Sequence, residues 1–179
     1  MSAPILRERA GAGSGFSPGL AEAPELPSIS YGLIELFFFA YRDFVSDPDR
    51  LLGELSFGRA HHRVLHFVSR RPGMPVADLL DVLKITKQSL NRVLKELVDK
   101  GYVESRPGTA DRRQRLLFPT PVGAEFSRRL ARLQTRRITD ALAGCPETEA
   151  AARRFLFAMI DPAERARVRT MIQDASQDR

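Results

Sequence analysis

Apolar and polar positions divide the chain into a series of helices with a short pair of strands in the middle. The first helix is predicted to begin near Ser30, and from Leu33 to Val45 almost every position is apolar or aromatic. A helix that is apolar nearly all the way round has to be covered on most sides. A single small domain seldom covers a helix so completely, so a partner subunit is expected to supply the second wall. Asp47-Pro48 is expected to end or bend this helix.

Three more helices are predicted before the spacing of apolar residues changes from that of a helix to that of a strand. One runs from about Gly58 to Arg70, and a short amphipathic helix follows over residues 76–83. After a tight break at Lys84-Ile85, a longer helix is predicted from Thr86 to Lys100. Its apolar residues recur at the spacing of a single buried helix face, and Gly101 is the residue type expected just past a helix end.

Residues 102–106 and 115–118 have the composition of strands, and residues 107–111 between them have the chemistry of a turn. The sequence therefore predicts a hairpin with a basic loop. Thr120-Pro121 is then expected to open a long helix that Gly144 closes.

Two more helices are predicted at the carboxyl end, one over residues 146–160 and one that begins at Asp161. Both have apolar stripes of the kind that mediate association, although such stripes also pack within one chain. Residues 1–30 are rich in Gly, Ala, Ser and Pro and are predicted to form a flexible tail.

Composition excludes several classes of protein. The longest apolar run, over residues 36–41, is far too short to cross a bilayer, and the amino terminus does not read as a signal peptide. Cys145 is the only cysteine, so no disulfide forms within the chain. A reducing cytoplasm fits, and this count alone leaves secretion open. No nucleophile–base pair, phosphate loop or paired catalytic carboxylates stand out, so no enzymatic activity is expected.

The positive charge of the chain is concentrated. The net charge is +6, and residues 84–115 alone have a net charge of +5. A basic patch of this kind suits a polyanion, while the alternative is an ordinary solvated face. On the helix over residues 86–100, the polar face offers amide, guanidinium and ammonium groups that suit base edges and phosphates in the major groove. The candidate DNA contacts on this helix are Thr86, Lys87, Gln88, Ser89, Asn91, Arg92 and Lys95.

A short helix, a tight turn, a longer amphipathic helix and a basic hairpin follow one another as in a winged helix-turn-helix. Over residues 31–145, and most closely over 76–123, the chain resembles the MarR family of bacterial transcriptional regulators. The similarity rests on VADLLDVLKITKQSLNRVLKELVDKGYVESRPGTADRRQRLLFPTPVG, with its Asp-x-Arg wing signature at residues 111–113. The candidate DNA contacts in the wing are Arg106, Asp111, Arg112, Arg113 and Arg115. Asp111 and Arg113 are expected to pair side by side on an extended strand, and the alternative is that Asp111 only serves the turn.

The resemblance implies a mainly α protein with a small β-hairpin wing. It also implies an obligate homodimer with entwined terminal helices, bound to a palindromic operator on double-stranded DNA in a bacterial cytoplasm, at the nucleoid. The chain then divides into a tail over 1–30, a dimerisation helix over 31–57, a DNA-binding domain over 58–120 and dimerisation helices over 121–179. An architectural DNA-binding protein and a winged-helix adaptor for proteins are the alternatives.

Many members of the family are released from DNA by small aromatic acids or by oxidation. The resemblance therefore implies an effector pocket for an aromatic or amphipathic acid, between the first two helices, the start of the long helix and the DNA-binding lobe. Its candidate residues are Phe38, His62, Arg63 and His66. Two histidines on one helix do not complete a metal site, so neither a metal nor a cofactor is expected, and Cys145 is expected to be structural.

Overall fold

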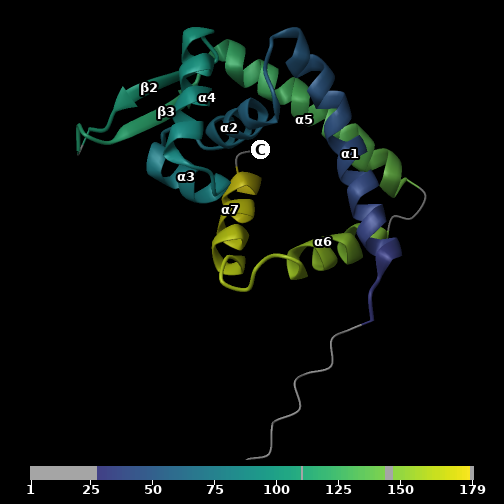
Figure 1. Ribbon diagram of the computed structural model, residues 1–179. Helices are drawn as coiled ribbons and strands as arrows, with labels where there is room; N and C mark the ends of the chain where they lie inside the picture. Colours follow the sequence, from purple (N-terminus) through teal and green to yellow (C-terminus); the bar gives the residue numbers. More distant parts are fainter. Residues whose placement is uncertain (1–27, 110, 144–146, 178–179) are drawn as a thin grey trace, which may run out of the picture.

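The structure is a computed structural model that describes residues 28–109, 111–143 and 147–177. Helices form most of it, and one small sheet lies at its edge (Figure 1). In chain order the elements are α1 (Tyr31–Glu54), α2 (Arg59–Arg70), β1 (Met74–Pro75), α3 (Val76–Leu83), α4 (Lys87–Asp99), β2 (Val103–Pro107), β3 (Arg115–Pro119), α5 (Pro121–Leu142), α6 (Thr148–Ala158) and α7 (Arg165–Gln177). The predicted tail over residues 1–30 lies almost entirely outside the described residues, and so do Gly144 and Cys145.

The hydrophobic core lies in one lobe, which we call the core lobe and which comprises α2 to β3 with the end of α1 and the first half of α5. Each helix of this lobe turns an apolar face inward, as the spacing of its residues predicts. The side chains at its centre are fully buried: Leu52, Val64, Leu65, Leu79, Leu90, Leu97, Leu117 and Leu130. Helices α3 and α4 match their predicted ranges to within one residue.

The sheet has three strands in the order β1-β3-β2, with antiparallel pairing throughout. Strands β2 and β3 form the predicted hairpin, in which Val103 pairs with Pro119 and Pro107 with Arg115. The sequence did not predict β1, because two residues carry no periodic pattern. Met74 pairs with Leu117, which ties the start of α3 to the base of the hairpin.

The sequence predicts that Asp47-Pro48 ends or bends α1. The helix continues to Glu54, so the prediction that it ends at Asp47-Pro48 is wrong. A proline inside a helix removes one backbone hydrogen bond. Here Pro48 is buried, and four residues later Leu52 is buried in the core, so packing offsets that loss. The Asp47 carboxylate also accepts a hydrogen bond from Arg137 of α5 at 3.0 Å.

The hairpin is joined to α5 by a close contact. Gly101, which ends α4 in the left-handed region at φ +73°, accepts a hydrogen bond from the Thr120 hydroxyl at 2.6 Å. The Thr120 oxygen in turn accepts from the N–H of Gly123 at 3.0 Å and caps α5. A Cβ atom at Gly123 would lie 1.9 Å from the carbonyl oxygen of Tyr102, so only glycine fits there.

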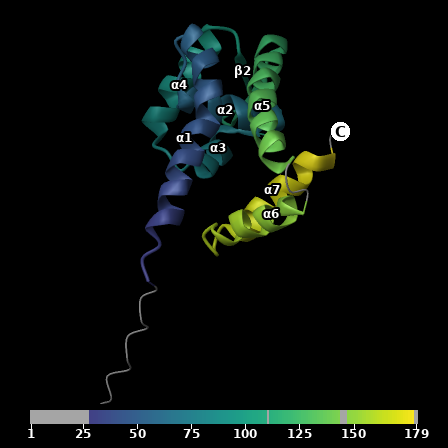
Figure 2. The same cartoon turned by 90° about the vertical axis from the view of Figure 1, so that its right-hand side faces the viewer.

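Helices α6 and α7 form an arm that lies apart from the core, below α1 and α5 in Figure 1 and to one side in Figure 2. None of the described side chains in this arm is buried. Helix α7 begins at Arg165 and not at Asp161, because the Asp161 carboxylate accepts from the N–H of Ala163 at 2.9 Å and forms a turn ahead of the helix. Within the described residues, no helix is long and apolar enough to cross a membrane.

Candidate nucleic-acid interface

Helix α4 presents two chemically distinct faces. Its apolar face, with Leu90, Val93, Leu94 and Leu97, is buried in the core lobe. The opposite face is exposed and carries Lys87, Gln88, Asn91, Arg92 and Lys95. Burial of one face fixes the rotation of the helix, so these five polar side chains point together into solvent.

Thr86 and Ser89 organise the first turn of α4. The Thr86 hydroxyl oxygen accepts from the N–H of Ser89 at 3.2 Å and donates to the Ser89 hydroxyl at 2.9 Å. This cap leaves the positive end of the helix dipole exposed at the surface, where a phosphate group is favoured.

A buried histidine supports α4 from behind. His61 of α2 accepts from the N–H of Gly58 at its Nδ1, at 3.1 Å, so its Nε2 carries the proton and donates to Glu96 of α4 at 2.9 Å. The ring also stacks on Phe57, with centroids 4.7 Å apart. His61 thus has a structural role, which sequence reasoning missed. The signal was its place on the buried stripe with Val64, Leu65 and Val68.

The wing carries its arginines in two settings. Arg106 is paired with Glu104 at 2.5 Å and lies over the Phe118 ring, and Arg115 donates to the Ser105 hydroxyl at 3.1 Å. Arg112 and Arg113 are exposed at the tip. These two guanidinium groups are therefore accessible to an anionic partner.

The expected side-chain pair between Asp111 and Arg113 is not formed. Residues 112–114 make a turn and not an extended strand, so the assumption that both side chains point to one side is wrong. The Asp111 carboxylate instead accepts from the backbone N–H of Arg113 at 2.9 Å. Its carbonyl also accepts from the N–H of Gln114 at 3.0 Å. Asp111 therefore shapes the tip of the wing, a common role for aspartate in turns.

Predicted DNA contacts from α4 and from the wing line the same hollow. It has a volume of about 540 Å³ and lies between α4 and the wing. Of the predicted contacts, it is lined by Lys87, Asn91, Lys95, Arg113 and Arg115. Gln88, Arg92, Arg106 and Arg112 do not line it. Lys95 is also paired with Asp99 at 2.5 Å, so its ammonium group has a competing partner within α4.

A second, smaller cavity of about 270 Å³ lies between α1, α2 and α5. Three predicted pocket residues, His62, Arg63 and His66, line it together with Tyr41 and Phe44. Phe38 does not line it, because this side chain is 69% exposed on an earlier turn of α1. Sequence reasoning missed the two aromatic residues, although both lie within one helical turn of Val45, the first buried residue of α1.

The two cavity histidines favour the neutral form. Burial lowers the pKa of His62, and burial together with the neighbouring His62 lowers the pKa of His66. Arg63 has no hydrogen-bond or ion-pair partner among the described residues, whereas Arg59 donates to Asp49 at 2.8 Å. In the described part of the chain, no group of three or more His, Cys, Asp or Glu side chains is arranged to hold a metal ion.

Comparison with known proteins gives relatives that point to one family. The MarR family model matches residues 55–114. The HTH-type transcriptional regulator PetP of Rhodobacter capsulatus is 50% identical over 143 residues, which are 79% of this chain and 86% of PetP. A mutant MarR from E. coli complexed with operator DNA has a TM-score of 0.57 at 23% identity, over 74% of this chain and 95% of that one. Streptococcus pneumoniae FabT in complex with DNA has a TM-score of 0.60 at 19% identity, over 69% and 90%.

The solved structures share the winged-helix fold, and the family segment covers the helix-turn-helix and most of the wing. PetP extends the likeness at the level of sequence to most of both chains. The chain therefore belongs to the MarR family of transcriptional regulators.

Proposed function

We propose that this protein is a homodimeric regulator that binds an inverted-repeat operator, with α4 in the major groove and the wing beside it. The observation that carries the proposal is the hollow between α4 and the wing, where Lys87 and Asn91 face Arg113 and Arg115. An α-helix fits the major groove of B-form DNA, and arginine suits the phosphates and the narrow minor groove next to it. Such a protein acts where bacterial DNA lies, in the cytoplasm at the nucleoid.

The exposed side chains of α4 favour reading of sequence over binding to the backbone alone. Gln88 and Asn91 each offer a donor and an acceptor that match adenine, and Arg92 offers two donors that match guanine. Lys87 and Lys95 suit phosphates, which position the protein without reading bases. An architectural protein would need only the second kind of contact.

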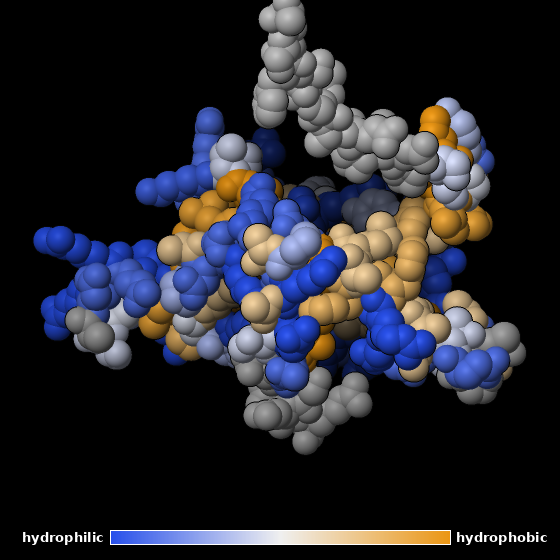
Figure 3. All heavy atoms as spheres, turned by 90° about the horizontal axis from the view of Figure 1, so that it is seen from below, coloured by the Kyte–Doolittle hydropathy of each residue, from blue (hydrophilic) through white to orange (hydrophobic). Residues whose placement is uncertain are grey.

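A second copy of the chain is the partner that best accounts for the uncovered apolar surface. Before Val45, α1 has no buried residue, and large apolar side chains are exposed on α1, on α6 and the residue that follows it, and on α7. They include Leu33, Leu36, Phe38, Phe39, Phe155, Leu156, Met159 and Ile172. Figure 3 shows apolar residues gathered on the lower face, on the side of α1 and α6. Continuous exposed surface of this kind is typical of an interface.

The groove between α6 and α7 is suited to receive a helix from the second copy. Its volume is about 560 Å³, and its walls include Leu156, Phe157, Ile160 and Ile172. Two such subunits present two α4 helices related by a two-fold axis. The operator is then an inverted repeat with half-site centres about 10 base pairs apart.

Recovery of DNA bound to the protein in its native genome tests the function directly. An inverted repeat should be enriched in the recovered fragments, and its binding should be measured for Asn91→Ala and Arg92→Ala. Each substitution should cost about 1–3 kcal/mol at one base pair and relax the preference there. Arg128→Ala, which removes an exposed arginine of α5, is the matched control.

Other outcomes point to the alternatives. Equal losses on every sequence would indicate an architectural protein whose α4 touches only phosphates. Recovery of a protein and no DNA would indicate a winged-helix adaptor.

The cavity between α1, α2 and α5 is the proposed effector site. Tyr41, Phe44 and Phe67 offer aromatic walls, and the unpaired Arg63 offers a cation for a carboxylate. An aromatic acid bound here would affect operator affinity only if it favours one spacing of the two α4 helices. Salicylate and benzoate are suitable probes, and each should raise the melting temperature and release operator DNA. Arg63→Ala should abolish both effects, and a thermal shift without release would contradict a regulatory role.

A further inference from the structure

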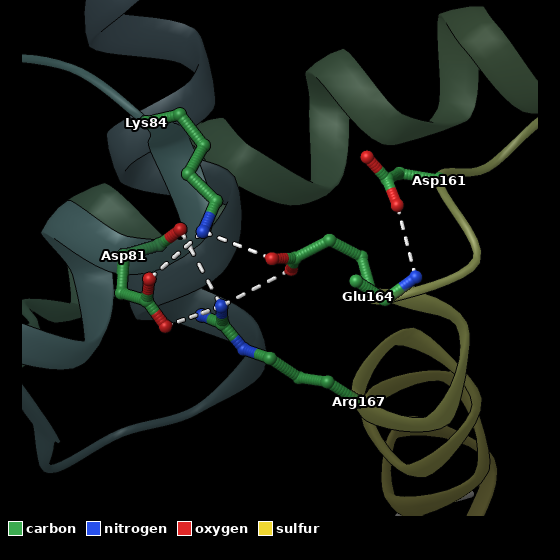
Figure 4. Close-up of polar contacts among 6 residues, drawn as sticks. Asp81, Lys84, Asp161, Glu164 and Arg167 are labelled. Atoms are coloured by element: carbon green, nitrogen blue, oxygen red, sulfur yellow. Dashed lines mark hydrogen bonds and ion pairs between the residues drawn. The ribbon is translucent and has the colours of Figure 1, made fainter.

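Helix α7 meets the helix-turn-helix at the turn between α3 and α4. Asp81 and Lys84 at the end of α3 face Glu164, just before α7, and Arg167 of α7 (Figure 4). The Lys84 Nζ lies 2.9 Å from the Asp81 carboxylate and 3.0 Å from that of Glu164. Arg167 contacts the Asp81 carboxylate and lies 3.4 Å from that of Glu164. The four charges therefore alternate in a closed ring.

Lys84 occupies the residue that redirects the chain from α3 to α4. Its φ of +50° lies in the left-handed region, where glycine or asparagine is the usual choice. Only Ile85 separates Lys84 from Thr86, the cap of α4. A side chain anchored at Lys84 thus restrains the direction in which α4 leaves the turn. The same two carboxylates, Asp81 first, raise the pKa of Lys84.

A second polar contact holds α7 against the lobe. Arg71, the residue that ends α2, donates to the backbone carbonyl of Met171, about one helical turn beyond Arg167. None of the described side chains of α7 is buried. These polar contacts between α7 and the lobe are directional. They therefore fix the orientation of α7 more than they add hydrophobic stability.

The other end of the arm is tied to the proposed dimerisation surface, by which we mean the exposed apolar side chains of α1, α6 and α7. Arg165 donates to the carbonyls of Ile160 at 2.9 Å and Ala158 at 2.6 Å, which joins the end of α6 to the start of α7. Phe155 of α6 packs against Phe37 of α1, with ring centroids 5.8 Å apart. A continuous set of contacts therefore runs from α1 through α6 and α7 to the turn before α4.

We propose that Glu164 and Arg167 are positioning residues that set the direction of α4 relative to the dimerisation surface and so select the spacing of operator half-sites. The proposal rests on the proposed binding of an inverted repeat by a dimer. Neither residue needs to touch DNA, because each acts through Asp81 and Lys84. Loss of the ring leaves the core of the lobe intact and widens the range of directions open to α4.

The test measures affinity for a series of operators of equal length whose half-site centres are moved apart by one or two base pairs. A ratio of affinities cancels the general effect of a changed protein charge, because every duplex has the same number of phosphates. Wild-type protein should lose at least about tenfold in affinity when the half-sites move by two base pairs. The double variant Glu164→Gln/Arg167→Gln should lose less than about threefold, while light scattering and the melting temperature remain near the wild-type values.

Two further variants separate positioning from charge. Arg128→Gln removes an exposed cation of α5 that pairs with Glu125 of the same helix and lies outside the ring, so it should keep the wild-type ratio. Inversion of all four charges, in Asp81→Lys/Lys84→Glu/Glu164→Lys/Arg167→Glu, rebuilds the alternating ring and should restore the ratio to within about twofold of wild type. An unchanged ratio in the double variant would overturn the proposal.

Hydrogen exchange on the DNA-free protein tests the positioning role of Glu164 and Arg167 separately from the proposed operator binding. The hydrogen-bonded amides around the turn, those of Lys84, Ser89 and Leu90, should exchange about tenfold faster in Glu164→Gln/Arg167→Gln than in wild type, and this readout needs no operator. Failure of wild type to bind any inverted repeat, together with this faster exchange, would refute the proposed function and leave the contact between α7 and the turn supported. Unchanged exchange would refute the positioning role itself.

Discussion

The core lobe and the surface formed by α1, α6 and α7 differ in how they cover their apolar side chains. Within the lobe, Val64, Leu79 and Leu90 are fully buried by helices of the same chain. In the first half of α1 and in the described part of α6 and α7, no side chain is buried. The lobe is thus covered within one chain, whereas the other surface is the one for which we propose a partner subunit.

The largest contrast should come from two matched leucines. Leu90→Ala removes a fully buried side chain of α4 and should cost about 2–5 kcal/mol of unfolding free energy. Leu36→Ala removes a side chain that is 63% exposed in one chain, so its cost should appear mainly as weaker dimerisation. Chemical denaturation at several protein concentrations separates the two effects. Equal losses of unfolding free energy in the two variants, independent of protein concentration, would show that the two regions do not differ in this way.

Charge introduced on α1 should separate the subunits without unfolding the lobe. Phe38→Asp/Phe39→Asp places two carboxylates on an apolar surface and should raise the dimer dissociation constant by a hundredfold or more, on the order of 3 kcal/mol. Light scattering should then report the mass of one chain. Val122→Asp, which alters an exposed apolar residue at the start of α5, should remain dimeric.

Substitutions in the wing should have a smaller effect, which we expect on operator binding. Asp111→Ala removes a negative charge near the DNA, which by itself favours binding, but it also removes the acceptor for the Arg113 N–H. We expect operator binding to weaken several-fold, because a loosened tip costs more than the charge gains. Arg113→Ala should make the salt dependence shallower by about one. Tighter binding by Asp111→Ala would show that the turn does not order the wing.

The smallest effect concerns pH at the boundary between the two regions. His62 and His66 have a lowered pKa in the fold, so below the unfolded value of 6.5 the unfolded chain takes up protons first. Stability is therefore fully present above about pH 6.5 and falls as the pH drops toward the folded pKa values, by at most about 1.4 kcal/mol per pH unit for each histidine. His62→Gln/His66→Gln should show a flatter loss between pH 7 and pH 5 than wild type, and parallel curves would contradict the assignment.

Periodicity predicted the elements that pack against one another in the lobe. Helix α3 has its predicted bounds, and α4 lies within its predicted range, because Leu90, Val93, Leu94 and Leu97 recur at helical spacing. The Thr86 and Thr120 caps were also readable, since each acts within a few residues of its own place in the chain.

The features that sequence reasoning missed depend on residues far apart in the chain. Helix α1 passes through Pro48 because Leu52 is buried by the rest of the lobe, and β1 exists only through its pairing with β3. The polar ring joins residues 81 and 84 to 164 and 167, a relation that no local pattern encodes. Asp111 and Arg113 were misjudged for a different reason: a turn was taken for a strand.

The contact at Gly123 has a consequence for the substitutions that the chain tolerates. With the Tyr102 carbonyl oxygen only 1.9 Å from where a Cβ would lie, a saturation library selected for operator binding should return glycine alone at this position. Gly101 has no neighbour within 4 Å of a Cβ and needs only its left-handed φ, so the same library should admit asparagine there. Two glycines on either side of the wing, 22 residues apart in the printed sequence, would thus leave opposite signatures in a collection of functional variants.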